Sequence, residues 1–143
     1  MSIAIGSDHA GFIMKEKISK YLKSKNFKII DKGAFSENSV DYAEFGHRVG
    51  NSIIEGESSK GIIICGTGIG ISIAANKIKG IRAALCTSPS HAEMSRLHND
   101  SNILALGSRM TEYKKMIQII DIWLDTNFEG GRHLKRINKI EVL

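Results

Sequence analysis

The chain has 143 residues, of which 42% are hydrophobic and 24% charged, a composition typical of one soluble globular domain with a sizeable core. No apolar run approaches the roughly 20 residues of a membrane-spanning helix, and the first residues lack the basic segment of a signal peptide, so we expect a cytoplasmic protein that does not bind membranes. The formal charge of +5 comes from interspersed basic and acidic residues, and aromatic residues make up only 6%, which disfavours nucleic-acid binding.

Apolar runs of strand length alternate with segments of helical periodicity along the whole chain. This alternation predicts a single α/β domain over residues 1–143, a Rossmann-like three-layer α/β/α sandwich around a five-stranded parallel sheet. The expected strands cover 2–7, 28–31, 61–65, 81–86 and 103–106, and the expected helices cover 12–25, 42–53, 71–78, 89–97, 112–124 and 132–140.

Two of the helix starts carry recognisable caps. The helix over 89–97 can begin either with Ser88-Pro89, which places proline at the first position, or with a capping box at Ser90-x-x-Glu93. Thr111 is expected to cap the helix that follows it.

The third strand runs into a glycine-rich turn, Cys65-Gly66-Thr67-Gly68-Ile69-Gly70. Backbone N–H groups at such a junction of strand, turn and helix can bind an anion. The turn is not a Walker-type loop, because no Lys-Ser or Lys-Thr follows, and Ile71 stands where a dinucleotide fingerprint needs glycine. We therefore expect no nucleotide cofactor. A turn that needs glycine only for its conformation is an equally good interpretation.

Cys65 ends the third strand, where open α/β sheets place their reactive groups. A helix N-terminus favours the thiolate, which can act as a base or as a nucleophile. A lone cysteine is more often a small buried hydrophobic residue, and we keep that interpretation for Cys86, which no glycine turn follows. The spacing of the two cysteines fits no zinc motif and a reducing cytoplasm argues against a disulfide, so we expect no metal site.

Polar residues follow the first strand and precede the fifth. Asp8 and His9 should lie beside Cys65, because adjacent parallel strands end at one edge of a sheet. There an aspartate can move protons between neighbouring oxygens and a histidine can hold an anion, although Asp8 could instead cap the next helix. His98 and Asn99 should lie at the opposite edge, so we expect them to act at the Cys65 site only across a subunit interface. The alternative is a surface or C-cap histidine.

The last helix, about 131–142, follows a double-glycine break and is expected to take part in subunit contacts. Arg132 and Arg136 lie four residues apart on it, and like charges at that spacing repel by about 0.2–0.5 kcal/mol. An anion between them is therefore reasonable, and guanidinium groups suit phosphate. Arg109, after the fifth strand, is a third candidate; the alternative is a solvated basic face. Taken together, the candidates suit proton abstraction beside the carbonyl of a sugar phosphate, through an enediolate.

Several segments resemble the ribose-5-phosphate isomerase B family, whose wider group includes galactose-6-phosphate isomerase subunits and allose-6-phosphate isomerases. The resemblance implies a metal-free and cofactor-free interconversion of ribose 5-phosphate and ribulose 5-phosphate in the pentose phosphate pathway. It also implies a homodimer, which could pair into a tetramer, with active sites shared between subunits. The matching residues are 5–12, 41–42, 65–70, 98–100, 107–109, Arg132 and Arg136.

The resemblance also implies a role for each site residue. Some family members place a glutamate base a few positions later, but Ile69 and Ile71 cannot serve as bases, so this chain resembles the branch that uses cysteine. Cys65 would move the proton between C2 and C1, His98 would open the furanose ring, and Asp8 would exchange protons with O1 and O2. The implied catalytic residues are Cys65, His98, Asp8 and Thr67, and the implied substrate-binding residues are Asp8, His9, Gly66, Thr67, Gly68, Ile69, Gly70, Asn99, Arg109, Arg132 and Arg136.

Two other functions are consistent with the same residues. One is the same isomerisation of a six-carbon sugar phosphate, since the sequence does not reveal the length of the pocket. The other is a non-catalytic module that binds a sugar phosphate or a nucleotide through the glycine turn. A thiol base beside Asp8 argues against the second, because a binding module needs no base.

Overall fold

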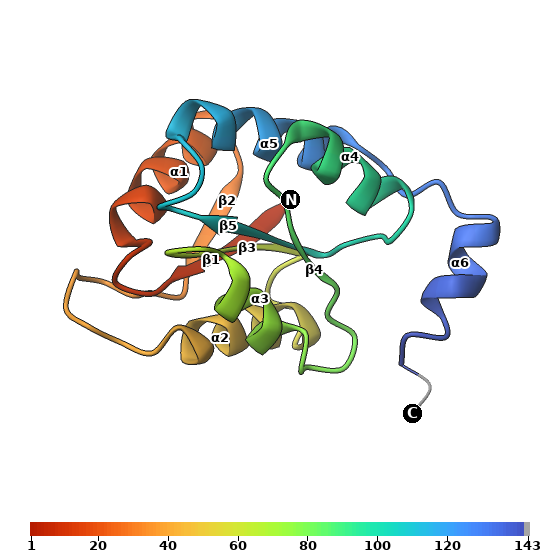
Figure 1. The fold of residues 1–143 in the computed structure, drawn as a ribbon, viewed down its shortest axis with the longest axis horizontal. Coiled ribbons are helices and arrows are strands. Elements are labelled where there is room, and N and C mark those ends of the chain that lie inside the picture. The colour runs from red at the N-terminus through yellow and green to blue at the C-terminus, as the bar shows by residue number, and fades with distance from the viewer. Residues whose placement is uncertain (142–143) are drawn as a thin grey trace.

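The structure is a computed structural model that describes residues 1–141 (Figure 1). Within this range five strands form one sheet in the order β2-β1-β3-β5-β4, and every neighbouring pair is parallel. The predicted α/β fold is therefore confirmed. The strands are β1 (Ser2–Ser7), β2 (Lys28–Asp31), β3 (Lys60–Cys65), β4 (Ala83–Leu85) and β5 (Ile103–Gly107), and the helices are α1 (Phe12–Ser24), α2 (Tyr42–Ile54), α3 (Ile69–Ala75), α4 (Pro89–Leu97), α5 (Tyr113–Asp125) and α6 (Arg132–Ile137).

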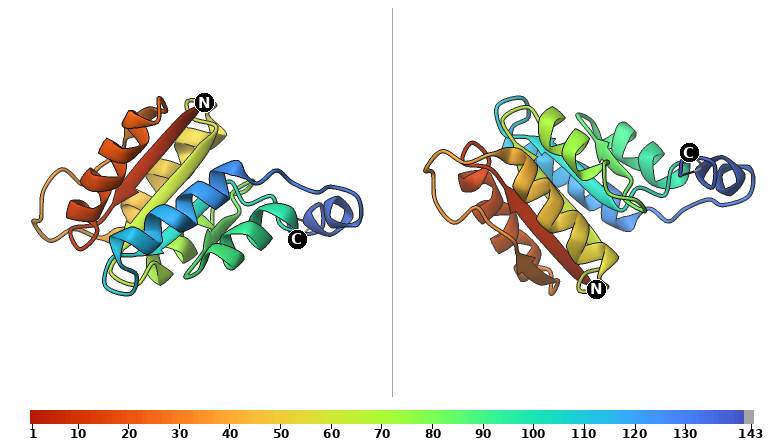
Figure 2. Two further views of the ribbon diagram at one scale, coloured as in Figure 1. Left: turned by 90° about the horizontal axis from the view of Figure 1, so that it is seen from above. Right: turned by 90° about the horizontal axis from the view of Figure 1, so that it is seen from below.

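The central strand β3 separates two apolar cores. Its side chains alternate between the faces of the sheet, as the period of a strand requires. Ile62 and Ile64 pack in the core beneath α1, α4 and α5, whereas Ile63 and Cys65 pack in the core beneath α2 and α3. Figure 2 shows these two helical layers from opposite sides. None of the helices in residues 1–141 has the length and apolar character needed to cross a bilayer.

The structure decides between the two predicted caps of α4 and corrects the cap of α5. Ser88 caps α4, since its Oγ accepts the His91 N–H at 3.2 Å and Pro89 is the first helical residue. The prediction that Thr111 caps α5 was wrong, because this helix begins at Tyr113. The Thr111 N–H donates to the Gly107 carbonyl at 3.1 Å, so Thr111 belongs to the turn that ends β5.

The fourth strand and the last helix are shorter than predicted, and the third helix, expected over 71–78, covers Ile69–Ala75. The strand expected over 81–86 is confined to Ala83–Leu85, because Ile81 packs into the core beneath α2 and α3 and the Arg82 N–H donates to Asn102 Oδ1 at 2.8 Å. The last helix ends at Ile137 rather than at residue 140. Residue 142, the end of the segment expected to make subunit contacts, lies outside the described residues.

A side chain covers part of the open edge of the sheet at β4. Asn76, which follows α3, donates from Nδ2 to the Ala83 carbonyl at 3.0 Å and accepts the Ala83 N–H at Oδ1 at 2.8 Å. The amide group thus makes the two backbone bonds that a further strand would make at this position.

A buried polar network fixes the turn between α4 and β5, which carries His98 and Asn99. The indole N–H of Trp123 donates to Ser101 Oγ at 2.8 Å, and Ser101 is also bonded to Ser95 Oγ at 2.9 Å. Arg96, which is buried as well, donates to the Ser101 carbonyl at 2.7 Å. The position of His98 and Asn99 therefore depends on groups inside the protein rather than on the surface.

We predict that Trp123→Phe lowers the free energy of unfolding by about 1–3 kcal/mol, because it removes a buried hydrogen bond and leaves a void. The measurement is the urea midpoint, compared with Tyr113→Phe on the same helix. Tyr113 is partly exposed and its hydroxyl makes no hydrogen bond within residues 1–141. Equal midpoints for both variants would show that the indole bond contributes little.

Candidate active site

The carboxyl ends of three neighbouring strands bring the first group of predicted residues together. The Asp8 N–H donates to the Ile64 carbonyl at 3.2 Å, which places Asp8 beside the end of β3. The Arg109 N–H donates to the Gly66 carbonyl at 2.9 Å, which joins the residue after β5 to the glycine turn. Asp8, Cys65 and Arg109 therefore lie at one edge of the sheet, as the alternation of strands and helices predicted.

The glycine turn folds back on the sulfur that precedes it. The Gly68 N–H donates to Cys65 Sγ at 3.1 Å, and the Ile69 N–H donates to Thr67 Oγ1 at 3.2 Å. Gly68 has a φ of +79°, which a side chain would strain. The turn thus places a backbone hydrogen-bond donor directly on the side chain of Cys65.

The two other glycines of the turn leave space for side chains from elsewhere. A Cβ atom at Gly66 would lie 3.0 Å from Arg109 Nη1, and one at Gly70 would lie 2.0 Å from the ring of Tyr42. Glycine is thus needed here both for conformation and for close approach. Tyr42 borders the turn although the pattern of charged and sulfur-containing residues gave it no role.

Asp8 and His9 are both held by backbone groups. The buried Asp8 carboxylate accepts the Gly11 N–H at 3.1 Å, so it supports the start of α1 while it faces the edge of the sheet. His9 Nδ1 lies 3.1 Å from the Val40 nitrogen and 3.2 Å from the Val40 carbonyl oxygen, so it can accept a hydrogen bond from the one or donate to the other. This bond also ties the loop before α2 to the site.

The second group of predicted residues lies at the opposite edge. His98 is the C-cap of α4 and, with Asn99, precedes the first residue of β5, whereas Cys65 pairs with Gly107 at the last. The length of β5, about 13 Å, separates the two groups. One chain does not bring them together, which agrees with the expectation that His98 and Asn99 reach a Cys65 site only across a subunit interface.

Helix α6 adds its arginines to this second group. Figures 1 and 2 show α6 at one end of the molecule, beyond α4. Arg132 and Arg136 line a hollow of about 360 Å³ together with Lys135 of the same helix and Lys139, which follows it. The hollow is entirely basic, as a site for a phosphate group requires. Asn99 borders a larger hollow of about 570 Å³ beside β4.

Two residues that lie near His98, namely Glu129 and His133, were assigned no role from the sequence. The rings of His98 and His133 stack with centroids 4.4 Å apart and planes inclined by 16°, and Glu129 Oε2 lies 3.7 Å from His133 Nε2. Burial lowers the pKa of His133, and the neighbouring His98 lowers it further. In the sequence, the spacing Glu129-x-x-x-His133 is too common to indicate a site. It gains meaning only from the contact of His133 with His98 at the end of α4.

These three side chains could be mistaken for a metal site, since one ligand atom from each lies within 4.8 Å of the others. The nearly parallel rings, however, keep their nitrogen lone pairs in two stacked planes rather than directing them toward a common point. Tetrahedral coordination needs converging lone pairs. The arrangement is one of stacking.

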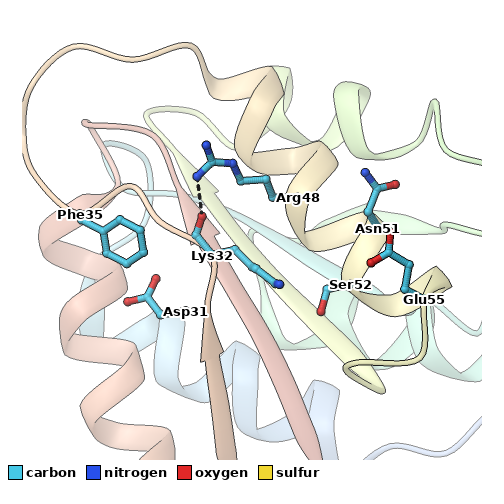
Figure 3. Close-up of a pocket in the computed structure, with 7 residues that line it drawn as sticks. All are labelled: Asp31, Lys32, Phe35, Arg48, Asn51, Ser52 and Glu55. Atoms are coloured by element: carbon cyan, nitrogen blue, oxygen red, sulfur yellow. Dashed lines mark hydrogen bonds between the residues drawn. The ribbon is translucent and has the colours of Figure 1, made fainter.

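A further hollow, of about 360 Å³, contains none of the predicted residues (Figure 3). It lies between the end of β2 and α2, and Arg48 Nη1 donates across it to the Lys32 carbonyl at 3.3 Å. Its cations are already paired, Arg48 with Glu44 and Lys32 with Glu57. It is therefore a poor anion site.

Comparison with known proteins agrees with this geometry. The ribose/galactose isomerase family model matches residues 3–140. The chain belongs to this family. It is 46% identical to ribose-5-phosphate isomerase B of Escherichia coli over 99% of this chain and 95% of that protein, and 48% identical to a putative sugar phosphate isomerase of Rickettsia bellii over 97% and 96%.

Solved structures of family members superpose closely. Ribose-5-phosphate isomerase B of Clostridium thermocellum has a TM-score of 0.99 and 51% identity, covering 99% of this chain and 96% of that one. The Mycoplasma genitalium enzyme, with bound ribulose-5-phosphate, has a TM-score of 0.93 and 42% identity, covering 99% and 94%. The Rossmann-like parallel sheet is thus the fold of the family.

The two cysteines should differ in reactivity. Burial raises the pKa of Cys86 to about 11, so its thiol stays protonated at neutral pH, whereas the Cys65 sulfur lies at the glycine turn and accepts a hydrogen bond from the Gly68 N–H. We expect iodoacetamide at pH 7.5 to modify Cys65 first in the folded protein, as measured by peptide mass spectrometry. The urea-unfolded chain, in which both should react, is the control. Faster labelling of Cys86 would contradict this assignment.

Proposed function

We propose that this chain is an aldose–ketose isomerase that interconverts ribose 5-phosphate and ribulose 5-phosphate. The observation that carries the proposal is the Cys65 sulfur, which accepts an N–H bond at the same edge of the sheet as the buried carboxylate of Asp8. The names of the Escherichia coli and Clostridium thermocellum relatives support the choice of substrate, as does the ribulose-5-phosphate bound to the Mycoplasma genitalium relative.

The proposed mechanism moves only protons. His98 protonates the ring oxygen of the furanose while Asp8 takes the proton of O1, which opens the ring to the aldehyde. The Cys65 thiolate takes the C2 proton, giving an enediolate, and returns it to C1. Asp8 carries a proton between O2 and O1, and Thr67 with the backbone of the turn stabilises the negative oxygen. No electron is transferred to a second molecule, so this chemistry needs no redox cofactor.

We further propose that the active site forms between two copies of the chain. Ile69 and Ile73 lie one turn apart on α3 beside the glycine turn and are 52% and 56% exposed, and Leu134 on α6 is 50% exposed. A two-fold dimer would bury such surfaces twice and would bring His98, Asn99 and the arginines of one copy to Cys65 of the other. Both cysteines are free thiols, which suits work in the reducing cytoplasm.

Substitution of the proposed base tests the chemistry. Cys65→Ala should lower kcat for ribose 5-phosphate by about 10²- to 10⁴-fold, because it removes the base that we propose takes the C2 proton. Binding of ribulose 5-phosphate, measured by calorimetry, should change little. Cys86→Ala is the matched control and should keep its activity. Full turnover by Cys65→Ala would remove Cys65 as the base.

The same assay separates the proposed substrate from the alternative. Ribose 5-phosphate should be converted with a higher kcat/KM than allose 6-phosphate or galactose 6-phosphate. The description of the family includes galactose, and this makes the six-carbon sugars the relevant comparison. A higher kcat/KM for one of the six-carbon sugar phosphates would leave the proposed mechanism in place but would make that sugar phosphate the substrate.

Co-expression of two inactive variants tests the shared site. If Cys65 and His98 act from different copies, a mixed dimer of Cys65→Ala and His98→Asn has one site that carries both changes and one intact site. Random mixing should then restore about a quarter of the wild-type activity, because half of the dimers are mixed. Sites within a single chain would give no restoration. Size-exclusion chromatography with light scattering distinguishes a dimer from a tetramer.

A further inference from the structure

The structure assigns a positioning role to His133: its ring stacks on His98 and sets the plane in which His98 meets the furanose ring. This inference rests on the proposed ring-opening role of His98. His133 itself would touch neither the substrate nor the reacting atoms.

The stack is the contact that orients the His98 ring. His98 caps α4, so it lies at a helix end, where side chains have more freedom than in the middle. It is only half-buried, and no hydrogen bond within residues 1–141 involves its ring nitrogens. Against this freedom, the ring of His133 lies 4.4 Å away and is inclined by 16°. Offset stacking of aromatic rings contributes about 0.5–1.5 kcal/mol, enough to favour one ring orientation.

His133 is held by burial and by its backbone. The residue is 4% exposed, and its backbone N–H donates to the Gly130 carbonyl at 3.1 Å, in the double-glycine segment before α6; its ring Nε2 makes no hydrogen bond within residues 1–141. The neighbouring Glu129 N–H donates to the Leu97 carbonyl at 3.1 Å, which ties this segment to the end of α4. A fixed ring beside a freer one is the arrangement that a positioning residue needs.

Burial is the main reason that His133 favours its neutral form, because it is the largest influence lowering the pKa of this side chain. Of the groups that face it, His98, Arg132 and Arg136 lower the pKa further, and Glu129 raises it. A neutral His133 places no fixed positive charge against His98.

The stack also links the two parts of the substrate. His133 lies between Arg132 and Arg136 on α6, so the helix that carries the proposed phosphate clamp is the helix that orients His98. The phosphate and the ring oxygen of ribose 5-phosphate are separated by a fixed number of bonds. One contact between α6 and α4 thereby sets the separation of the groups that would bind each end.

The test needs one reaction that requires ring opening and one that does not. Turnover of ribose 5-phosphate, which is mainly a furanose, requires it. Exchange of the C1 hydrogen of ribulose 5-phosphate with D₂O, followed by NMR, requires only the base, since this ketose cannot close to a furanose. Both are measured at saturating substrate, and kcat values are compared, because equilibrium fixes the ratio of forward and reverse kcat/KM.

We expect His133→Leu to lower kcat for ribose 5-phosphate by about ten- to a hundredfold, the cost of a misplaced catalytic group, while the exchange rate stays within about twofold. His133→Phe, which keeps a flat ring in the same place, should retain most of the kcat. His98→Asn should reproduce the pattern of His133→Leu. His47→Leu, at an exposed histidine on α2, is the matched control and should alter neither rate.

Several outcomes would overturn the inference. Equal losses of turnover and exchange in His133→Leu would show that His133 only docks α6, and an equal loss in His133→Phe would show that its nitrogens matter rather than its plane. Tight binding of Zn²⁺ alone that disappears in His133→Phe would assign the cluster to metal binding. Failure of the proposed function is distinct: it would be seen as an inactive wild type, or as a His98→Asn variant that loses both rates equally.

Discussion

The close approach of two backbones at the carboxyl ends of β3 and β5 is the constraint on which the candidate site depends. A Cβ atom at Gly107 would lie 2.5 Å from the Thr67 carbonyl oxygen, and one at Gly68 would lie 2.8 Å from the backbone of Leu106. Only glycine, which has no Cβ atom, lets the two backbone segments come so close at these positions. Because they do, the turn after β3 curls back on the Cys65 sulfur and meets Arg109 and Asp8. The reactive groups are thus placed by steric exclusion as much as by attraction.

Much of this could be predicted from periodicity and from the geometry of parallel sheets. Buried apolar runs mark strands, and parallel strands end together, so Asp8 had to lie near Cys65. The boundaries were less predictable because tertiary contacts decide them. Ile81 is apolar enough for a strand but packs beneath α2 and α3 instead, and the Thr111 N–H is already used by the carbonyl of Gly107. Local sequence does not encode either contact.

The part of the site that escaped prediction lies where a residue's role depends on a distant partner. Tyr42 borders the glycine turn only because Gly70 leaves room for its ring. His133 sits between two arginines and reads as part of a solvated basic face, yet it is buried against His98. In both cases an aromatic ring fills a place that the motif itself leaves open. Motifs made of charged and sulfur-containing residues therefore outline such a site but omit the rings that give it shape.

The amide of Asn76 on the edge of the sheet limits how copies of this chain can associate. An open edge strand invites a second sheet to continue it, which is also the first step of many aggregates. Here the Ala83 N–H and carbonyl are occupied by a side chain of the same molecule. A sheet continued across two copies through β4 would first have to displace that amide. Association through helices and side chains does not compete with that amide.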